Sequence, residues 1–179
     1  MKHANDIRSA FLDFFVAKGH ALVPSSSLVP SRDDPSVLLT TAGMQQFKPY
    51  FLGIKDPEKD FGARSTTSSQ RSFRTADIES VGDPSHLTFF EMLGNFSFNG
   101  YGKKEAIAYA WEFLTETVHI PKDRLWVTIF EGDANAPRDT EAEKVWLTYV
   151  PKDRIRACSK KDNWWGPTGC WALRRRPIR

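Results

Sequence analysis

The sequence is poor in cysteine and has no long apolar run, and each absence removes a class of protein. Its 179 residues include two cysteines, Cys158 and Cys170, which neither form a Cys-x-x-Cys pair nor lie near clustered histidines. A disulfide framework is therefore ruled out, and we expect no bound metal, zinc included, in this segment. No stretch could span a bilayer, and the start lacks the apolar core of a signal peptide. We therefore expect a cytoplasmic protein with no membrane partner.

The sequence also lacks a strong excess of charge, an internal repeat and a glycine-rich nucleotide loop. The net charge is +3. The four arginines among the last six residues exceed this surplus, so it gives no argument for nucleic-acid binding. Without a Gly-x-Gly-x-x-Gly loop or a regular alternation of strands and helices, a Rossmann fold is disfavoured. A hydrophobic share of 40%, with 13% aromatic residues, is typical of a globular domain. The mixed order of elements predicts an α+β fold.

Apolar spacing predicts the main helices and strands. Ile7, Phe11 and Phe14 follow helical spacing, with Asn5 or Asp6 as the expected cap and Gly19 as the stop. His20 follows this helix, and we assign it no function. The other expected elements are a buried strand over Val37–Thr41, a helix over Lys103–Val118, a strand over Leu125–Phe130, a loop over Gly132–Pro137 and a helix from a capping box at Thr140–Glu143 through Tyr149.

One segment has the residue types of a nucleotide site. Arg74 ends an extended stretch, and after a polar connection containing Gly82-Asp83-Pro84 comes His86-Leu-Thr-Phe-Phe-Glu-Met92. If this second stretch is a strand from its first residue, His86 and Phe90 share one face. A guanidinium fork suits phosphate oxygens, and a phenyl ring offers a stacking surface for a purine. The plainer alternative is a solvated arginine and a core phenylalanine.

Several long motifs resemble the N-terminal catalytic domain of the alanyl-tRNA synthetase family, in order, from about Ile7 to Gly169. They are Pro24–Pro30, Leu39–Lys48, Tyr50–Gly53, Thr88–Phe98, Ala110–Thr115 and Lys160–Trp165. The resemblance implies a class II synthetase core, in which an antiparallel sheet flanked by helices binds ATP and the amino acid.

The resemblance also implies residue roles and partners. Arg74 matches the motif 2 arginine that holds the α-phosphate. His86, Phe90 and Met92 match the ATP pocket, and Trp165, Asn95 and Met44 match the amino-acid pocket. The implied substrates are ATP with Mg²⁺, L-alanine and alanine tRNA, with zinc expected only in a separate editing domain. The first helix could build a homodimer face or pack on its own sheet.

The chain departs from the family pattern in two places. A glycine- and lysine-containing insertion that often follows the motif 2 arginine is absent, and Ser85-His-Leu87 replaces a basic loop end. We therefore expect the phosphate contacts to be fewer or to be supplied by other residues. Beyond Gly169 the family continues with Gly-Pro-Cys-Gly. Codons for Trp171-Ala-Leu-Arg-Arg175, read from their second base, can encode that sequence, so we hypothesise a frame slip.

These departures set the expected domain limits. We assign residues 1–169 to the N-terminal part of the aminoacylation domain, with motifs 1 and 2, and residues 170–179 to an aberrant basic tail. Motif 3, the aspartate that binds the alanine amine and the editing domain are missing, so we expect the fragment to be inactive alone. Two alternatives stay open: a truncated nucleotide- or protein-binding module without ligase activity, and a paralogue that activates another small amino acid.

Overall fold

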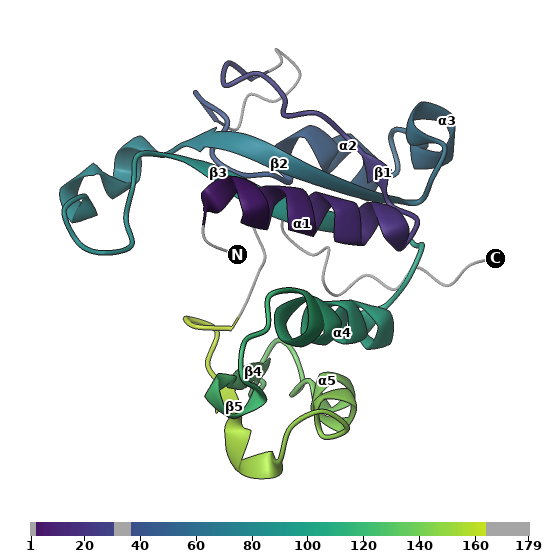
Figure 1. Cartoon of the computed structure of the whole chain (residues 1–179), viewed down its shortest axis with the longest axis vertical. Coiled ribbons are helices and arrows are strands. Elements are labelled where there is room, and N and C mark those ends of the chain that lie inside the picture. The colour runs from purple at the N-terminus through teal and green to yellow at the C-terminus, as the bar shows by residue number, and fades with distance from the viewer. Residues whose placement is uncertain (1–2, 31–36, 164–179) are drawn as a thin grey trace. The chain divides into compact units, whose positions relative to one another are not determined.

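The computed structural model describes residues 3–30 and 37–163. They fall into two compact units, divided after Gly102, which are described separately. The elements of the first unit are α1 (Ala4–Ala17), β1 (Ala21–Leu22), η1 (Gln45–Phe47), α2 (Lys48–Phe51), α3 (Pro57–Phe61), β2 (Ser65–Phe73), η2 (Thr75–Ser80) and β3 (Phe89–Ser97). Strands β2 and β3 form a long hairpin whose tip projects beyond the sheet (Figure 1).

The sheet of the first unit has the order β1-β2-β3 and is mixed. β1 runs parallel to β2, and β3 runs antiparallel to it. Ser65 pairs with Ser97 at one end and Phe73 with Phe89 at the other, without an interruption of the register. An uninterrupted register assigns every side chain of β2 and β3 to one of two faces by simple alternation.

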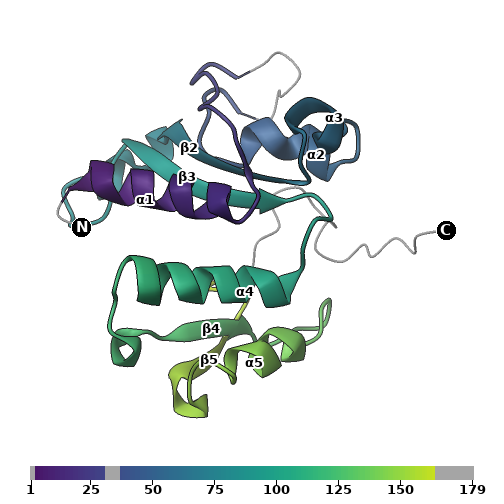
Figure 2. The same ribbon diagram turned by 45° about the vertical axis from the view of Figure 1, so that its right-hand side comes forward.

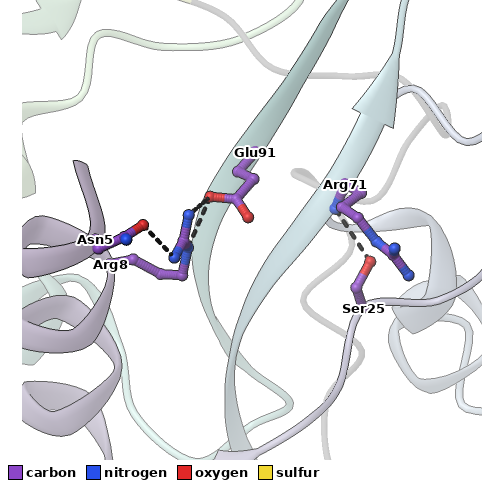
Figure 3. A network of polar contacts seen from close by, with 5 residues as sticks. All are labelled: Asn5, Arg8, Ser25, Arg71 and Glu91. Carbon is purple, nitrogen blue, oxygen red and sulfur yellow. Dashed lines mark hydrogen bonds and ion pairs between the residues drawn. The ribbon is translucent and has the colours of Figure 1, made fainter.

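Helix α1 covers one face of this sheet (Figure 1). Arg8 of this helix donates from Nε to the Glu91 carboxylate of β3 at 2.7 Å and from a terminal guanidinium nitrogen to Asn5 at 2.9 Å (Figure 3). The predicted helix is confirmed, but its start is different. It is capped by His3, whose backbone N–H donates to the Asp6 carboxylate at 3.2 Å.

The segment from Thr41 to Phe51 covers the opposite face. Phe47 is fully buried, with its ring centroid 4.6 Å from that of Phe96 and 5.7 Å from that of Phe98. Aromatic rings at these centroid distances pack favourably in offset or tilted arrangements, and each buries a large apolar area. Strands β2 and β3 therefore lie between a helix and a short helical segment.

The strand predicted over Val37–Thr41 is wrong. Leu38 is 96% exposed, and within the segment only Thr40 has backbone bonds of a strand-like kind. Its N–H donates to the carbonyl of Leu28 at 2.8 Å, and its carbonyl accepts from Phe73 N–H at 2.9 Å. Thr40 alone joins this segment to its two neighbours, whereas a strand needs a series of such backbone hydrogen bonds. The segment is therefore an extended loop.

The second unit also combines helices with a small sheet. Its elements are α4 (Lys103–Glu112), η3 (Phe113–Thr117), η4 (Lys122–Arg124), β4 (Val127–Phe130), α5 (Thr140–Trp146), η5 (Lys152–Arg154) and β5 (Ile155–Cys158) (Figure 2). Strands β4 and β5 pair in parallel. Ile129, Trp111, Phe113 and Val150 are among its buried apolar residues.

Two predictions for this unit need correction. The α5 helix begins at Thr140, but its cap is Asp139, whose carboxylate accepts the Ala142 N–H at 3.1 Å, and it ends at Trp146 rather than Tyr149. β4 starts at Val127, two residues later than predicted. The helix predicted over Lys103–Val118 is confirmed as α4 continued by the π-helical turn η3.

The α+β fold class is confirmed, and within residues 3–30 and 37–163 the antiparallel strand pairing is that of β2 with β3. The parallel strand β5 was not predicted, because four residues, Ile155-Arg-Ala-Cys158, are too few to show a strand pattern. Among the described residues, no helix is long and apolar enough to cross a membrane.

Candidate nucleotide and amino-acid site

Arg74 lies at the junction between β2 and the hairpin tip. Its backbone N–H donates to the carbonyl of Thr88 at 2.8 Å, which closes the base of the tip. Its side-chain Nε donates to the carbonyl of Thr41 at 3.0 Å, and its guanidinium carbon lies 5.3 Å from the centroid of the Phe90 ring. The guanidinium is therefore oriented by a backbone carbonyl on one segment and by an aromatic ring on another.

Phe90 and Met92 lie on the same face of β3, the face toward the Thr41–Phe51 segment. The Met92 sulfur accepts the Gly43 N–H at 3.3 Å, so this strand contacts the loop that carries Met44. Met44 itself is buried at the start of η1. The structure therefore brings Arg74, Phe90, Met92 and the loop before Met44 together, as the sequence predicts.

Gly43 and Gly94 differ in how closely neighbouring atoms approach them. A Cβ added at Gly43 would lie 3.6 Å from the Gln70 Cβ and from the Phe96 ring, which is ordinary van der Waals contact. Gly94 is different, because an added Cβ would lie 2.7 Å from the Phe96 ring. A side chain at position 94 would therefore clash with Phe96, whereas position 43 has room for a Cβ.

His86 is not on the strand, so the prediction that it shares a face with Phe90 is wrong. β3 begins only at Phe89, and the residues before it belong to a turn organised by Asp83. One carboxylate oxygen of Asp83 accepts the backbone N–H groups of Ser85 at 2.8 Å and His86 at 2.7 Å, and the other lies 2.6 Å from His86 Nδ1.

These contacts have an electrostatic consequence for Asp83. The backbone N–H of Ser85 first, and then the His86 ring, lower the pKa of the Asp83 carboxyl to about 2. The charged carboxylate therefore holds the His86 ring by Nδ1 in the exposed hairpin tip. The position of the His86 ring therefore depends on the hairpin tip and not on the strand.

Asn95 lies on the opposite face of β3 from Phe90 and Met92. Its Nδ2 donates to the Tyr101 hydroxyl at 3.0 Å, and that hydroxyl lies 2.9 Å from Nε2 of the buried His20. Burial lowers the pKa of His20, because desolvation disfavours the imidazolium. The structure does not bring Asn95 to the face with Phe90, so the position of its side chain gives no support to a contact with the amino acid.

Two glutamines that organise this site were not predicted. The side-chain oxygen of buried Gln70 accepts from Ser26 N–H at 2.9 Å, Ser26 Oγ at 3.0 Å and Gln46 Nε2 at 3.1 Å. Its amide nitrogen donates to the carbonyls of Ser26 at 3.1 Å and Arg71 at 2.7 Å. One buried amide therefore attaches two loops to the centre of β2.

Gln45 also holds a loop in place, and this loop contacts Arg74 directly. Its side-chain oxygen accepts the backbone N–H groups of Thr41 at 2.6 Å and Ala42 at 3.1 Å. Because the Thr41 carbonyl accepts from Arg74 Nε, Gln45 fixes the segment that orients this arginine. Gln45 lies inside one of the recognised motifs, which was the available signal for it. Gln70 lies outside them, and nothing in the polar sequence of β2 showed that its side chain is buried.

Trp165 and residues 170–179 lie outside the described residues, so the predicted wall of the alanine pocket and the frame slip stay predictions. Within the described ranges, no three histidine, cysteine, aspartate or glutamate side chains come together in a way that could hold a metal ion.

Comparison with known proteins agrees with the geometry. Residues 6–170 match the family described as tRNA synthetases class II (A). Over 170 residues the chain is 61% identical to the alanine–tRNA ligase of Rubrobacter xylanophilus and 51% identical to that of Dehalococcoides mccartyi, covering 94% of this chain in each case. It is 51% identical over 168 residues to the alanine–tRNA ligase of Treponema denticola.

The chain spans only part of these relatives. It covers 19% of the Rubrobacter protein, 18% of the Dehalococcoides protein and 27% of the Treponema protein. The family match nevertheless extends over nearly the whole chain and includes every residue of the site described above. The chain therefore belongs to the class II tRNA synthetases (A).

Proposed function

We propose that this chain is the N-terminal part of the catalytic domain of an alanine–tRNA ligase and supplies one half of its ATP site. The observation that carries the proposal is the placement of Arg74, whose guanidinium lies over the Phe90 ring and is bonded to Thr41. This arrangement offers a stacking surface and a phosphate-binding fork at the same face of one hairpin.

The reaction requires the alanine carboxylate to attack the α-phosphorus of ATP, forming alanyl-adenylate and releasing pyrophosphate. Arg74 stabilises the negative charge that develops on the α-phosphoryl oxygens, and its fixed orientation avoids reorganisation during the step. Phe90 stacks on adenine. Mg²⁺ bound with ATP neutralises charge on the outer phosphates. In a complete enzyme the alanyl group then passes to alanine tRNA.

The remaining parts of the proposal concern partners and limits. Met44 and Trp165 bound the alanine pocket, and His86 in the hairpin tip contacts the outer phosphates. Residues 1–169 form the catalytic segment, and residues 170–179 result from a frame slip. The protein acts in the cytoplasm, the homodimer stays a possible assembly, and zinc belongs to an editing domain outside this chain.

Two measurements on the 179-residue chain test the proposal. Isothermal titration calorimetry with ATP reports the half-site, and we expect binding. Alanine-dependent exchange of pyrophosphate into ATP reports the complete reaction, and we expect none. ATP binding without exchange fits both a half-site and a stand-alone binding module, and resequencing the DNA beyond the Gly169 codon separates them. A chain that binds no ATP contradicts the proposal.

A volume substitution tests the pocket assignment in the reading-frame-restored enzyme. Trp165→Ala enlarges the wall of a small pocket, so discrimination against amino acids larger than alanine should fall by about 10- to 100-fold. The ratio of kcat/KM values in pyrophosphate exchange for alanine and for valine measures this effect. Unchanged ratios would remove Trp165 from the pocket.

A further inference from the structure

A short repeated motif marks one end of the β4–β5 pair. The residues Pro-Lys-Asp-Arg occur twice, over 121–124 and 151–154. Each copy forms a 3-10 turn, closed by an arginine N–H that donates to the proline carbonyl at 2.9 Å in the first copy and 3.0 Å in the second. Because the strands that follow run parallel, both turns lie at the same end of the pair. A match of only four residues is too short to be recognised as a repeat from the sequence.

The register of the two strands places a tryptophan among arginines. Val127 pairs with Ile155, so Trp126 lies beside Arg154. The guanidinium carbon of Arg156 lies 4.5 Å from the Trp126 ring centroid, and that of Arg154 lies 5.4 Å from it. Side chains alternate along a strand, and Trp126 and Thr128 point outward whereas Val127 and Ile129 point inward. We refer to Trp126, Thr128, Arg154 and Arg156 as the Trp126 face.

This face is open and carries cations. Trp126 remains 52% exposed despite its two arginine neighbours, and Arg156 is exposed. The adjoining turns add Lys122, Arg124 and Lys152, which are all exposed. Asp123 and Asp153 offset part of this charge, and Glu116 lies 3.3 Å from Lys122. The arginines that flank the indole have no acidic partner in the described ion pairs.

We propose that the Trp126 face binds single-stranded nucleic acid, with a base stacked on the indole and the flanking phosphates on Arg154 and Arg156. An exposed aromatic ring between cations combines the two interactions that bind single strands, base stacking and neutralisation of the backbone. A duplex hides the faces of its bases, so it would meet only the cations. The inference rests on this surface alone and does not depend on the ATP site.

Fluorescence anisotropy of a labelled 12-nucleotide RNA of mixed sequence, titrated with the full chain, tests the proposal. Trp126→Ala should weaken binding about tenfold through lost stacking, and Trp126→Phe should stay within threefold of the original chain. Arg156→Ala should weaken binding several-fold and reduce the dependence on salt concentration. A cooperative thermal transition like that of the original chain shows that each variant is folded.

Matched controls make the outcome decisive. Lys55→Ala removes one exposed positive charge from the other unit and should leave RNA binding unchanged. Equal weakening by Lys55→Ala and Arg156→Ala would show general electrostatic attraction and overturn the proposal. Binding that prefers the duplex form of the same RNA, or that is matched by polyglutamate, would also overturn it, the latter in favour of an acidic protein partner.

Discussion

The two faces of the β2–β3 hairpin are stabilised in different ways. On the face toward the Thr41–Phe51 segment, the buried amide of Gln70 makes hydrogen bonds to two loops, and Gln45 fixes the carbonyl that receives Arg74. On the α1 face, Arg8 and Glu91 form a partly exposed ion pair (Figure 3). Asn95 on the same face donates to the Tyr101 hydroxyl. Buried amides left unpaired are costly, whereas exposed ion pairs contribute little. The hydrogen bonds on the face toward the Thr41–Phe51 segment therefore hold side chains and loops in fixed positions. The contacts on the α1 face mainly attach the helix to the sheet.

The largest expected difference between the faces concerns ATP. Arg74→Ala should lower the adenylation rate of a reading-frame-restored enzyme about 100- to 1000-fold, because it removes a charge that acts on the α-phosphate. Arg71→Ala removes the same charge from the other face of β2 and should change the rate less than threefold. Pyrophosphate exchange measures both. Near-normal exchange by Arg74→Ala would remove this residue from catalysis.

Stability should differ between the faces as well. Gln70→Ala leaves the polar groups of Ser26 and Gln46 without their partner and should lower the free energy of unfolding by about 2–4 kcal/mol. Asn95→Ala on the α1 face should cost about 1 kcal/mol. Urea denaturation followed by circular dichroism measures both values. Equal losses would contradict the distinction between the faces.

Gln45 offers a finer test of how Arg74 is oriented. Gln45→Ala should weaken ATP binding about fivefold, because Thr41 loses the bond that fixes its carbonyl. Gln45→Glu keeps an oxygen acceptor for both N–H groups and should bind ATP within twofold of the original chain. The NMR signal of Arg74 Nε–H should change in the alanine variant alone. An unchanged signal in Gln45→Ala would show that Gln45 does not act through Arg74.

The smallest expected effect belongs to His20 on the α1 face. Burial lowers the pKa of His20 below its ordinary value of about 6.5, so the unfolded chain binds a proton more readily than the folded chain. Its contribution to stability is therefore complete above about pH 6.5 and is lost as the pH falls through the folded pKa. Urea denaturation at pH 7.5 and 5.5 should show a larger difference for the original chain than for His20→Gln. An identical difference would exclude His20 as a cause.

Local signals predicted part of this structure, and tertiary contacts decided the rest. The α1 and α4 helices follow from apolar residues at helical spacing, which act within a few turns of chain. The polar residues of β2 gave no such signal, because Thr66, Ser68 and Gln70 are buried by segments distant in sequence. Val37–Thr41 has the composition of a strand but does not pair along its length with a neighbouring strand.

The candidate site shows the same division. Arg74, Phe90 and Met92 could be found because they lie in recognisable motifs and on one strand face. Asn95 is three residues from Met92, but an odd separation along a strand places it on the opposite face. Asp83 was recognised as part of a turn, but the reach of its carboxylate to His86 depends on the folded conformation of the tip.

The uninterrupted pairing of β2 with β3 limits how this hairpin can change during evolution. Inserting one residue between Phe89 and Ser97 would exchange the faces of all strand residues beyond it. Side chains that now face the Thr41–Phe51 segment would turn toward α1, and those that contact α1 would turn toward that segment. Insertions and deletions are tolerated only where the two strands of the hairpin are not paired. The hairpin tip between Arg74 and Phe89 meets this condition.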